Sequence, residues 1–498
     1  MTFVILAAGT LVRMIGITRP LLGNFATKGV VYAMIARNFA SDPGTLFYPT
    51  LGVMINGKPA LHMTEWPFFS YFVGAVHRTL PWLSIDATGR ACSAVFFMLS
   101  AWFFYLLFRR MFDGGPANHA LMFYVFFPLG IIYGQSFQLE SCVMFCITGL
   151  FYLVYSWIEG KRDVWRGVFI WSLASTLLLM KPQMICLALP VFALFAADRN
   201  GKGLLAGPGL YIFTGLCLIP PVVWYLHTFH VAQTSDNVFF SVLYSMKIRA
   251  FPDPRIFTPD FYLRIARTLS KEVFSPVGLA LAGAGLFVIR GLERRKKYFV
   301  FAYIIAMAVS FLSLPRKIYE MNYYFMPVLV PGAILASYGL SVFRSRAVRG
   351  SVILIFIVVS VVIARNPAFR TPGNEKNYIS AAEVIDQCIP EHARIIVSSA
   401  GSNMAFLYYT GRTGWTLDPA AVDRTGPETK AREGLGMETA VAPEKLLEKY
   451  REEGAMYYVC DDVSYLKRAN RGLYRYLLAN YSPVREKDYF IVRLAPRK

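Results

Sequence analysis

The fold is decided by the stretch T-F-V-I-L-A-A-G-T-L-V-R-M-I-G-I-T, residues 2–18, and by the segment that follows it. This run is apolar over nearly the length of a membrane-spanning helix. Because it lacks a basic leader and a small-residue cleavage site, we interpret it as a retained span and not as a signal peptide. Residues 19–87 are too polar, and too broken by Pro and Gly, to cross a bilayer. A large polar segment directly after the first span indicates a function at the membrane surface.

The composition indicates that most of the chain, and not only residues 2–18, forms membrane-spanning helices. Apolar residues make up 55% of the 498 residues and charged residues only 16%, whereas a soluble domain carries about a quarter charged residues. We therefore predict an α-helical polytopic membrane protein with about 11 spans. The predicted spans are 2–18, 88–108, 118–137, 141–157, 168–181, 183–197, 207–226, 276–290, 298–314, 323–341 and 351–364.

The net charge of +20 does not indicate a nucleic-acid partner, because the cations gather in short connectors between the predicted spans. They are Arg109 and Arg110; Lys161, Arg162 and Arg166; Arg199 and Lys202; Arg290, Arg294, Arg295, Lys296 and Lys297; and Arg344, Arg346 and Arg349. All five clusters fall on one side, and the positive-inside rule makes that side cytoplasmic. The N-terminus then starts in the cytoplasm, and eleven crossings place the C-terminal tail outside.

The chain divides into two predicted domains. Residues 1–364 form the transmembrane domain, including the outer loop 19–87, and residues 365–498 form an extracytoplasmic α/β domain. Strands and helices alternate in this tail, which has no glycine-rich phosphate fingerprint; residues 423–430 are predicted to be a mobile loop. A disulfide between Cys388 and Cys460 is left open, since both lie in apolar contexts that suit buried thiols equally well.

Two acids near the outer ends of the predicted spans are candidates for catalysis, because ionisable groups at membrane depth are costly. Glu140 lies in Y-G-Q-S-F-Q-L-E-S-C, where the third span meets the outer surface. Partial desolvation of a carboxylate there favours a raised pKa and action as a base. Glu65, in T-E-W-P-F-F, is the second candidate. The alternatives are an exposed loop acid for Glu140 and a surface or ion-paired residue for Glu65.

Cations at the same level would suit an anionic head group. The candidates for binding a phosphate are Lys28, Arg37, Lys181, Arg316 and Lys317. Lys28 and Arg37 lie nine residues apart on a predicted helix and so cannot share one face. Each cation alone is more often a snorkelling anchor. Cations from three separate span ends make a phosphate site a stronger interpretation than any one of them does.

Several motifs occur in an order that resembles a known class. They are Y-A-M-I-A-R (32–37), N-G-K-P (56–59), E-W-P-F-F-S-Y (65–71), the acid at the third span, K-P (181–182) and N-Y-Y-F-M-P-V-L-V-P (322–331). The pattern is similar to that of the GT-C membrane glycosyltransferases, in the branch of protein mannosyltransferases and lipid A aminoarabinose transferases. The resemblance covers roughly residues 1–364.

This resemblance implies a sugar donor linked to a polyprenyl phosphate, transfer at the outer face, and inversion at the anomeric carbon. It implies a lipid, glycan or protein acceptor, contact with membrane lipids, and substrate contacts from Asn322, Tyr323 and Tyr324. A carboxylate, Glu140 or Glu65, would take the proton of the attacking hydroxyl. The cations would stabilise the leaving phosphate.

The chain departs from the family pattern at two positions. The family's Asp-Glu pair aligns with Lys28-Gly29, and the family Lys of an E-K-P-P element aligns with Glu65. The two charges look exchanged, so one carboxylate and one cation would remain if both side chains enter one cavity. Because of this exchange, we predict Glu140 as the base in preference to Glu65.

No metal-ligand spacing is visible, so we predict no cofactor while leaving a divalent metal open. A transporter or flippase of lipid-linked sugars is the alternative from another class; an odd span count and the lack of an inverted repeat speak against it. An oligosaccharide ligase with a pyrophosphate-linked donor is the alternative enzyme. An inactive scaffold is the third, with Lys28-Gly29 as the sign of lost catalysis.

Overall fold

The structure is a computed structural model that describes residues 1–23, 26–112, 114–160, 163–197, 199–242, 253–371, 377–420 and 442–496. The chain forms two compact units, each assembled from three segments. Unit 1 comprises Met1–Thr18, Ala87–Leu226 and Arg249–Arg370. Unit 2 comprises Arg19–Asp86, His227–Ile248 and Thr371–Lys498. The predicted division at residue 364 follows membrane topology, which this grouping does not test, so it stays a prediction.

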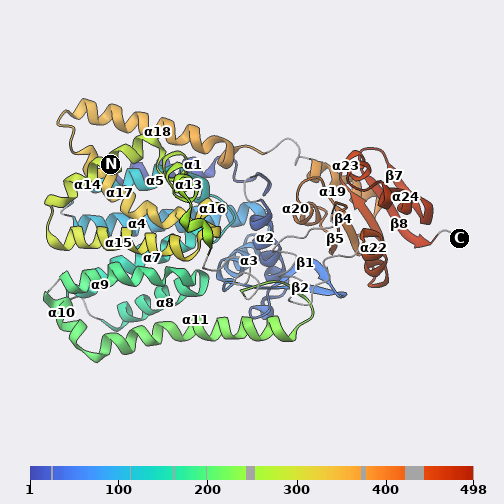
Figure 1. The fold of residues 1–498 in the computed structure, drawn as a ribbon, viewed down its shortest axis with the longest axis horizontal. Coiled ribbons are helices and arrows are strands. Elements are labelled where there is room, and N and C mark those ends of the chain that lie inside the picture. Colours follow the sequence, from blue (N-terminus) through green and yellow to red (C-terminus); the bar gives the residue numbers. More distant parts are fainter. Residues whose placement is uncertain are drawn as a thin grey trace. The chain divides into compact units, whose positions relative to one another are not determined.

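Unit 1 is a helical bundle (Figure 1). Its first half contains α1 (Thr2–Met14), α4 (Ile85–Met111), α5 (Ala117–Phe126), α6 (Pro128–Tyr133), α7 (Glu140–Ile158), α8 (Val164–Met180), η2 (Pro182–Leu187), α9 (Ala188–Ala197), α10 (Arg199–Ala206) and α11 (Pro208–Thr234). Its second half contains η3 (Pro254–Phe257), α13 (Pro259–Thr268), η4 (Leu269–Val273), α14 (Ser275–Val288), η5 (Ile289–Gly291), α15 (Arg294–Ser313), α16 (Pro315–Glu320), η6 (Asn322–Val328), α17 (Leu329–Leu340) and α18 (Arg346–Phe369).

Among the described residues, six helices are long and apolar enough to cross a membrane, or seven if one bent pair counts as a single span. Three shorter apolar helices accompany them, at Thr2–Met14, Val164–Met180 and Pro182–Ala197. The predicted total of about 11 counted every apolar run as one full crossing. The predicted span 118–137, for instance, is interrupted: α5 ends at Phe126 and α6 begins at Pro128, because proline has no N–H to continue the helical ladder. The predicted class, a polytopic helical membrane protein, is confirmed.

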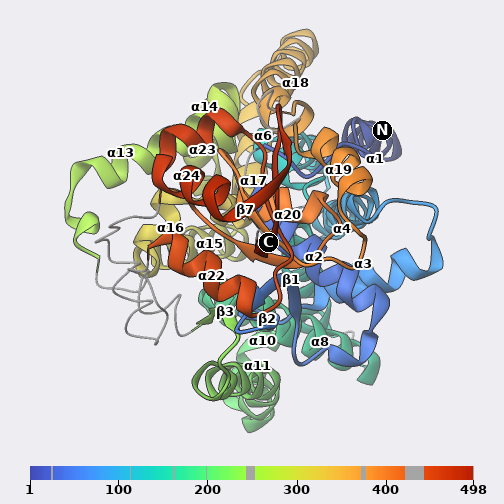
Figure 2. The same cartoon turned by 90° about the vertical axis from the view of Figure 1, so that its right-hand side faces the viewer.

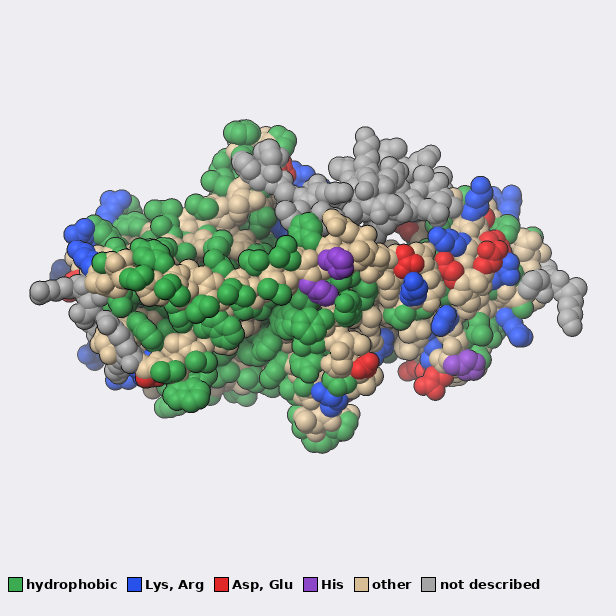
Figure 3. Space-filling view, turned by 90° about the horizontal axis from the view of Figure 1, so that it is seen from below, with side chains coloured by type: hydrophobic (Ala, Val, Ile, Leu, Met, Phe, Trp, Pro, Cys, Tyr) green, Lys and Arg blue, Asp and Glu red, His purple; other side chains and the backbone are tan. Residues whose placement is uncertain are grey.

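The surface of unit 1 agrees with this class. Hydrophobic side chains cover its length in Figure 3, and Lys and Arg gather at one end. Inside the bundle, α14 and α17 approach closely at two glycines. A Cβ on Gly339 would lie 1.9 Å from the carbonyl oxygen of Leu281, and a Cβ on Gly285 would lie 1.9 Å from that of Leu335. Only glycine permits this backbone contact, which is typical of packed membrane helices.

Unit 2 contains one eight-stranded sheet with the order β3-β2-β1-β5-β4-β6-β8-β7 (Figures 1 and 2). The strands are β1 (Thr50–Ile55), β2 (Lys58–Met63), β3 (Val238–Ser241), β4 (Ile395–Ser398), β5 (Gly414–Thr416), β6 (Tyr457–Cys460), β7 (Tyr481–Glu486) and β8 (Phe490–Pro496). The helices are α2 (Ala26–Ser41), η1 (Pro43–Thr45), α3 (Phe68–Thr79), α19 (Asn377–Cys388), α20 (Asn403–Tyr409), α22 (Pro443–Glu452), α23 (Val463–Ala469) and α24 (Arg471–Asn480).

The predicted α/β character of the tail is confirmed, since parallel strands β4, β5 and β6 alternate with helices. Its core includes Ile396, Trp415, Tyr458 and Phe490. Cys388 and Cys460 are both free thiols, so the disulfide left open by the sequence is not formed. The predicted loop 423–430 lies outside the described residues.

The first polar segment contributes strands to the same sheet. A tight turn at Asn56 and Gly57, both with positive φ, joins β1 to β2 as an antiparallel hairpin. On its other side β1 pairs in parallel with β5, where Val53 lies opposite Gly414. The polar segment 19–87 is therefore not structurally independent of the tail, because its hairpin and the tail contribute strands to one sheet.

Candidate functional site

Glu140 and Lys181 form a buried ion pair in unit 1. Lys181 Nζ donates to Glu140 Oε1 at 3.0 Å, and the side chains are 9% and 1% exposed for Lys181 and Glu140. Glu140 begins α7, where the helix dipole favours a carboxylate. Lys181 follows the last residue of α8, and Pro182 ends that helix. The sequence singled out both residues separately, and the structure brings them together.

Two tyrosine rings pack against this pair. Lys181 Nζ lies 4.4 Å from the ring centre of Tyr324 and 4.9 Å from that of Tyr323. Both rings come from η6, which immediately precedes α17. Cations are attracted to aromatic faces at this distance, so the rings hold Lys181 without neutralising its charge. Two of the three residues expected to contact substrate thus surround the predicted cation.

The third of them, Asn322, belongs to a neighbouring hydrogen-bond network. Its Nδ2 donates to Glu272 Oε2 at 2.6 Å, and its Oδ1 accepts a hydrogen bond from the hydroxyl of Tyr133. The rings of Tyr133 and Tyr323 lie 6.0 Å apart, which joins this network to the ion pair. Neither Glu272 nor Tyr133 was predicted as a site residue. Glu272 lies just before a predicted span, so the rule that selected Glu140 would also have selected it.

Arg13, the charged residue within the predicted first span, supports the local backbone. Its guanidinium is completely buried and donates to the carbonyl oxygens of Gly9, Val125 and Gly130 at 2.8–2.9 Å. Val125 lies before the break between α5 and α6, and Gly130 lies after it, where its carbonyl oxygen also accepts from the Gly134 amide at 3.0 Å. Arg13 therefore stabilises the broken helix that ends at Tyr133.

The other two cations predicted in this unit differ in their surroundings. Arg316 Nε donates to Glu320 Oε1 at 2.8 Å, within the same short helix α16. Lys317 Nζ lies 5.8 Å from the ring centre of Tyr324, the ring that also contacts Lys181. Lys317 thus contacts the same ring as Lys181, while Arg316 pairs with a carboxylate.

In unit 2, Glu65 lies in a charged cluster with Tyr32, Lys28 and His62. The Tyr32 hydroxyl donates to Glu65 Oε1, and Lys28 Nζ lies 5.6 Å from the Tyr32 ring centre. Burial opposes ionisation of Glu65, but Lys28, His62 and the Tyr32 hydrogen bond outweigh it and lower the pKa to about 2. The apparent exchange of charges therefore brings one carboxylate and one cation together. A carboxyl with so low a pKa is a weak base.

The Arg37 side chain lies beside α20 and not in the Glu65 cluster. Its guanidinium lies 5.2 Å from the ring centre of Tyr408, on α20. Lys28 contacts Tyr32 instead, as expected for residues nine positions apart on α2. The structure therefore does not bring Arg37 together with Lys28.

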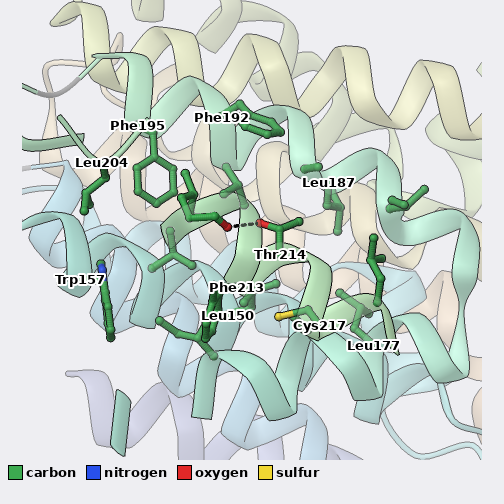
Figure 4. Close-up of a pocket in the computed structure, with 18 of the residues that line it drawn as sticks. Leu150, Trp157, Leu177, Leu187, Phe192, Phe195, Leu204, Phe213, Thr214 and Cys217 are labelled. Carbon is green, nitrogen blue, oxygen red and sulfur yellow. Dashed lines mark hydrogen bonds between the residues drawn. The ribbon is translucent and has the colours of Figure 1, made fainter. Parts of the chain in front are cut away.

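An apolar pocket of about 600 Å³ lies in unit 1 among α7, α8, η2, α9, α10 and α11. Figure 4 shows Phe192, Phe195, Phe213 and Leu177 among its lining side chains. The Thr214 hydroxyl donates to the carbonyl oxygen of Leu210 at 2.8 Å, so this hydroxyl is satisfied within its own helix. The lining fits a hydrocarbon chain and not a polar ligand.

Neither Glu140 nor Lys181 lines this pocket, but residues near Lys181 in the sequence do. Leu177 and Met184 both line it, and they lie on either side of Lys181 in the sequence. The Met184 amide donates to the Lys181 carbonyl oxygen at 3.0 Å. A molecule with its anionic group at Lys181 would therefore have an apolar space within a helical turn of that group.

Within the described ranges, no three His, Cys, Asp or Glu side chains gather as a metal site would. The expectation of no cofactor stays a prediction.

Comparisons with known proteins agree with this architecture. The family model for dolichyl-phosphate-mannose-protein mannosyltransferase matches residues 67–225. No curated protein matches the chain. ArnT from Cupriavidus metallidurans, bound to undecaprenyl phosphate, has a similar structure at 14% sequence identity, with a TM-score of 0.69. That match covers 99% of this chain and 97% of ArnT.

Two structures of the Archaeoglobus fulgidus oligosaccharyltransferase are also similar. The complex with Zn and sulfate gives a TM-score of 0.56 at 14% identity, covering 92% of this chain and 68% of that one. The complex of AglB with an inhibitory peptide and a dolichol-phosphate gives 0.55 at 13% identity, covering 100% and 74%. The similar structures confirm the predicted GT-C fold. The family model that matches residues 67–225 also describes a glycosyltransferase.

Proposed function

We propose that this protein is a membrane glycosyltransferase that moves a sugar from a polyprenyl-phosphate carrier to an acceptor hydroxyl. The buried Glu140–Lys181 pair carries this proposal, because it offers one base and one cation at one place. The adjoining apolar pocket supports a lipid-linked donor. The carriers named with the similar structures, undecaprenyl phosphate and dolichol-phosphate, are of this kind.

The reaction is a single displacement. The acceptor oxygen attacks the anomeric carbon, the bond from that carbon to the phosphate oxygen breaks, and the phosphate leaves with the electron pair. Attack opposite the leaving group inverts the anomeric carbon. Glu140 takes the proton of the acceptor hydroxyl. No general acid is required, because a phosphate is a stable leaving group.

The ion pair couples the two charge changes of this step. As Glu140 accepts the proton it loses its negative charge, while the departing phosphate gains one. Lys181, which neutralises Glu140 before the reaction, is then available to the phosphate. Lys317, 5.8 Å from the Tyr324 ring centre, adds a second cation near that ring. Glu65 holds Lys28 in place and is not the base, because its pKa of about 2 makes it a weak proton acceptor.

We propose that transfer takes place at the outer face of a bacterial inner membrane. Glu140 begins α7, whereas Glu159 follows its other end and pairs with Arg110 at 3.1 Å. Arg110 belongs to the basic connectors that the positive-inside rule assigns to the cytoplasm. About 28 Å of helix, roughly the thickness of the hydrocarbon core, separates Glu140 from that side. This orientation leaves the N-terminus in the cytoplasm and the tail outside.

The test uses the purified protein in detergent with a panel of polyprenyl-phosphate pentoses and hexoses and mixed envelope lipids as acceptors. Glu140→Gln should lower turnover by a factor of about 100 to 10,000, and Glu159→Gln at the other end of α7 is the control. The double variant Glu140→Gln/Lys181→Met removes both charges, so it should keep the fold without restoring activity. Undiminished turnover in Glu140→Gln would remove Glu140 from the mechanism. Movement of the lipid across sealed vesicles without transfer would favour a flippase.

A further inference from the structure

Glu272 lies in an unusual backbone turn. Residues Leu269–Val273 form a single π-helical turn, after which the chain bends by 110° between the helical segments 259–273 and 275–291. Ser275, just beyond the turn, is completely buried and has a φ of +64°. π-Turns and positive φ values at residues other than glycine are unfavourable, and they occur frequently where a protein directs a side chain for function. The side chain at this turn that carries a charge and a defined polar partner is Glu272.

The hydrogen bonds from Asn322 to Glu272 and from Tyr133 to Asn322 fix the orientation of the Asn322 amide. Because Glu272 Oε2 accepts from Asn322 Nδ2 at 2.6 Å, the amide of Asn322 is held with its oxygen toward Tyr133. The Tyr133 hydroxyl donates to that oxygen. Tyr133 is only 1% exposed and anchors the network, whereas Glu272 and Asn322 are partly exposed. Glu272 is thus the open end of a chain of hydrogen bonds that begins in the core.

A carboxylate accepts hydrogen bonds and donates none. The open end therefore suits a ligand that offers donors, such as the hydroxyl groups of a sugar, and it repels a phosphate. The phosphate has a separate place at Lys181, 4.9 Å from the ring centre of Tyr323, which itself packs against Tyr133. The two ends of the network thus match the two parts of a sugar phosphate.

We propose that Glu272, fixed by Asn322 and Tyr133, binds hydroxyl groups of the sugar that the carrier lipid delivers. The inference rests on the proposed function, because it assigns a subsite to the same donor. It makes Glu272 a determinant of sugar recognition, separate from the proton transfer assigned to Glu140.

The experiment measures binding of two probes to the full-length protein in detergent: bare undecaprenyl phosphate, and the panel of undecaprenyl-phosphate pentoses and hexoses. The wild type should bind at least one sugar-bearing lipid more tightly than the bare lipid. Glu272→Gln should weaken binding of that lipid about tenfold, as expected for the loss of a hydrogen bond to a charged group. Binding of the bare lipid should stay within twofold. Tyr133→Phe, which releases Asn322 but keeps Glu272, should cause a smaller loss in the same direction.

Glu293→Gln is the matched control, because Glu293 is 74% exposed and pairs with Lys296 in the same unit. Melting temperatures separate a folding defect from a binding defect. Equal weakening of both probes would assign Glu272 a general structural role and overturn the inference. So would a wild type that binds no sugar-bearing lipid more tightly than the bare one. Failure of the wild type to bind bare undecaprenyl phosphate would instead overturn the proposed function.

Discussion

At the scale of single residues, the chemical role of each candidate acid or lysine depends on the charged group beside it. The sequence showed Glu140 and Lys181 as two separate polar residues at the ends of apolar runs. Their contact joins residues 41 positions apart, and no local pattern predicts which span ends meet. Lys28 and His62 lie near Glu65 and lower its pKa to about 2. Glu65 is therefore a weak base, which leaves Glu140 as the candidate base. Asn322 was predicted as a substrate contact, whereas Glu272 was not selected although its position before a span would have allowed it. The hydrogen bond between the two residues has no local signal in the sequence.

The Glu65 cluster predicts a pH-dependent stability. Its pKa of about 2 in the folded protein lies below its ordinary value of 4.5. Ionised Glu65 therefore stabilises the fold above pH 4.5, and this contribution is lost as the pH falls from 4.5 toward 2. Glu65→Gln should lower the melting temperature at pH 7 by a few degrees, and the difference from the wild type should shrink below pH 4.5.

Thermal unfolding of the solubilised protein across pH 3–8 measures this difference, with exposed Glu391→Gln as the control variant. A difference that stays constant from pH 7 to pH 3 would contradict the assignment of Glu65 to this pair.

At the scale of elements, hydropathy located most spans but not their interruptions. Apolar runs predicted α4, α7, α15 and α18 well, since each is one continuous helix. The break at Pro128 stayed hidden inside the predicted span 118–137, because a broken helix has the same mean hydropathy as an intact one. The predicted span 276–290 begins at the bend, since α14 starts at Ser275. In the tail, β4, β6 and β8 were predictable from their β-branched and aromatic runs.

The contact between α14 and α17 predicts a sharp difference between two glycines. A Cβ at Gly339 would overlap the Leu281 carbonyl oxygen, whereas at Gly283, on the same pair of helices, a Cβ meets no atom within 4 Å. Gly339→Ala should destabilise the protein by about 1–3 kcal/mol. Gly283→Ala should be neutral or slightly stabilising, because alanine favours helix.

Melting temperatures of both variants in one detergent provide the measurement. Equal stability of Gly339→Ala and the wild type would show that the two helices separate at little cost.

At the scale of the whole molecule, the sheet of unit 2 depends on distant segments of the chain. Strand β1 follows the first span, and β5 belongs to the tail. The sequence does not indicate that the polar loop and the tail share a sheet, because strand pairing between residues 53 and 414 leaves no local signal.

This sheet predicts the effect of removing the tail. A chain that ends at residue 370 leaves β1 without β5, so its edge is open to solvent. Backbone amides of 50–55 should exchange hydrogen with solvent faster than in the full chain, while those of α14 should be unchanged. Hydrogen exchange followed by mass spectrometry measures both, and unchanged protection of 50–55 would contradict the pairing.

The pairing of β1 with β5 also has a consequence for biosynthesis. The hairpin 50–63 leaves the ribosome early, but β5, the parallel partner of β1, is made only after the helices α14 to α18. Contacts between such distant segments form slowly. Unit 2 therefore completes its sheet late in synthesis, and a chain interrupted before residue 414 contains the Glu65 cluster and strands β1 to β3 without β5, β6, β7 and β8.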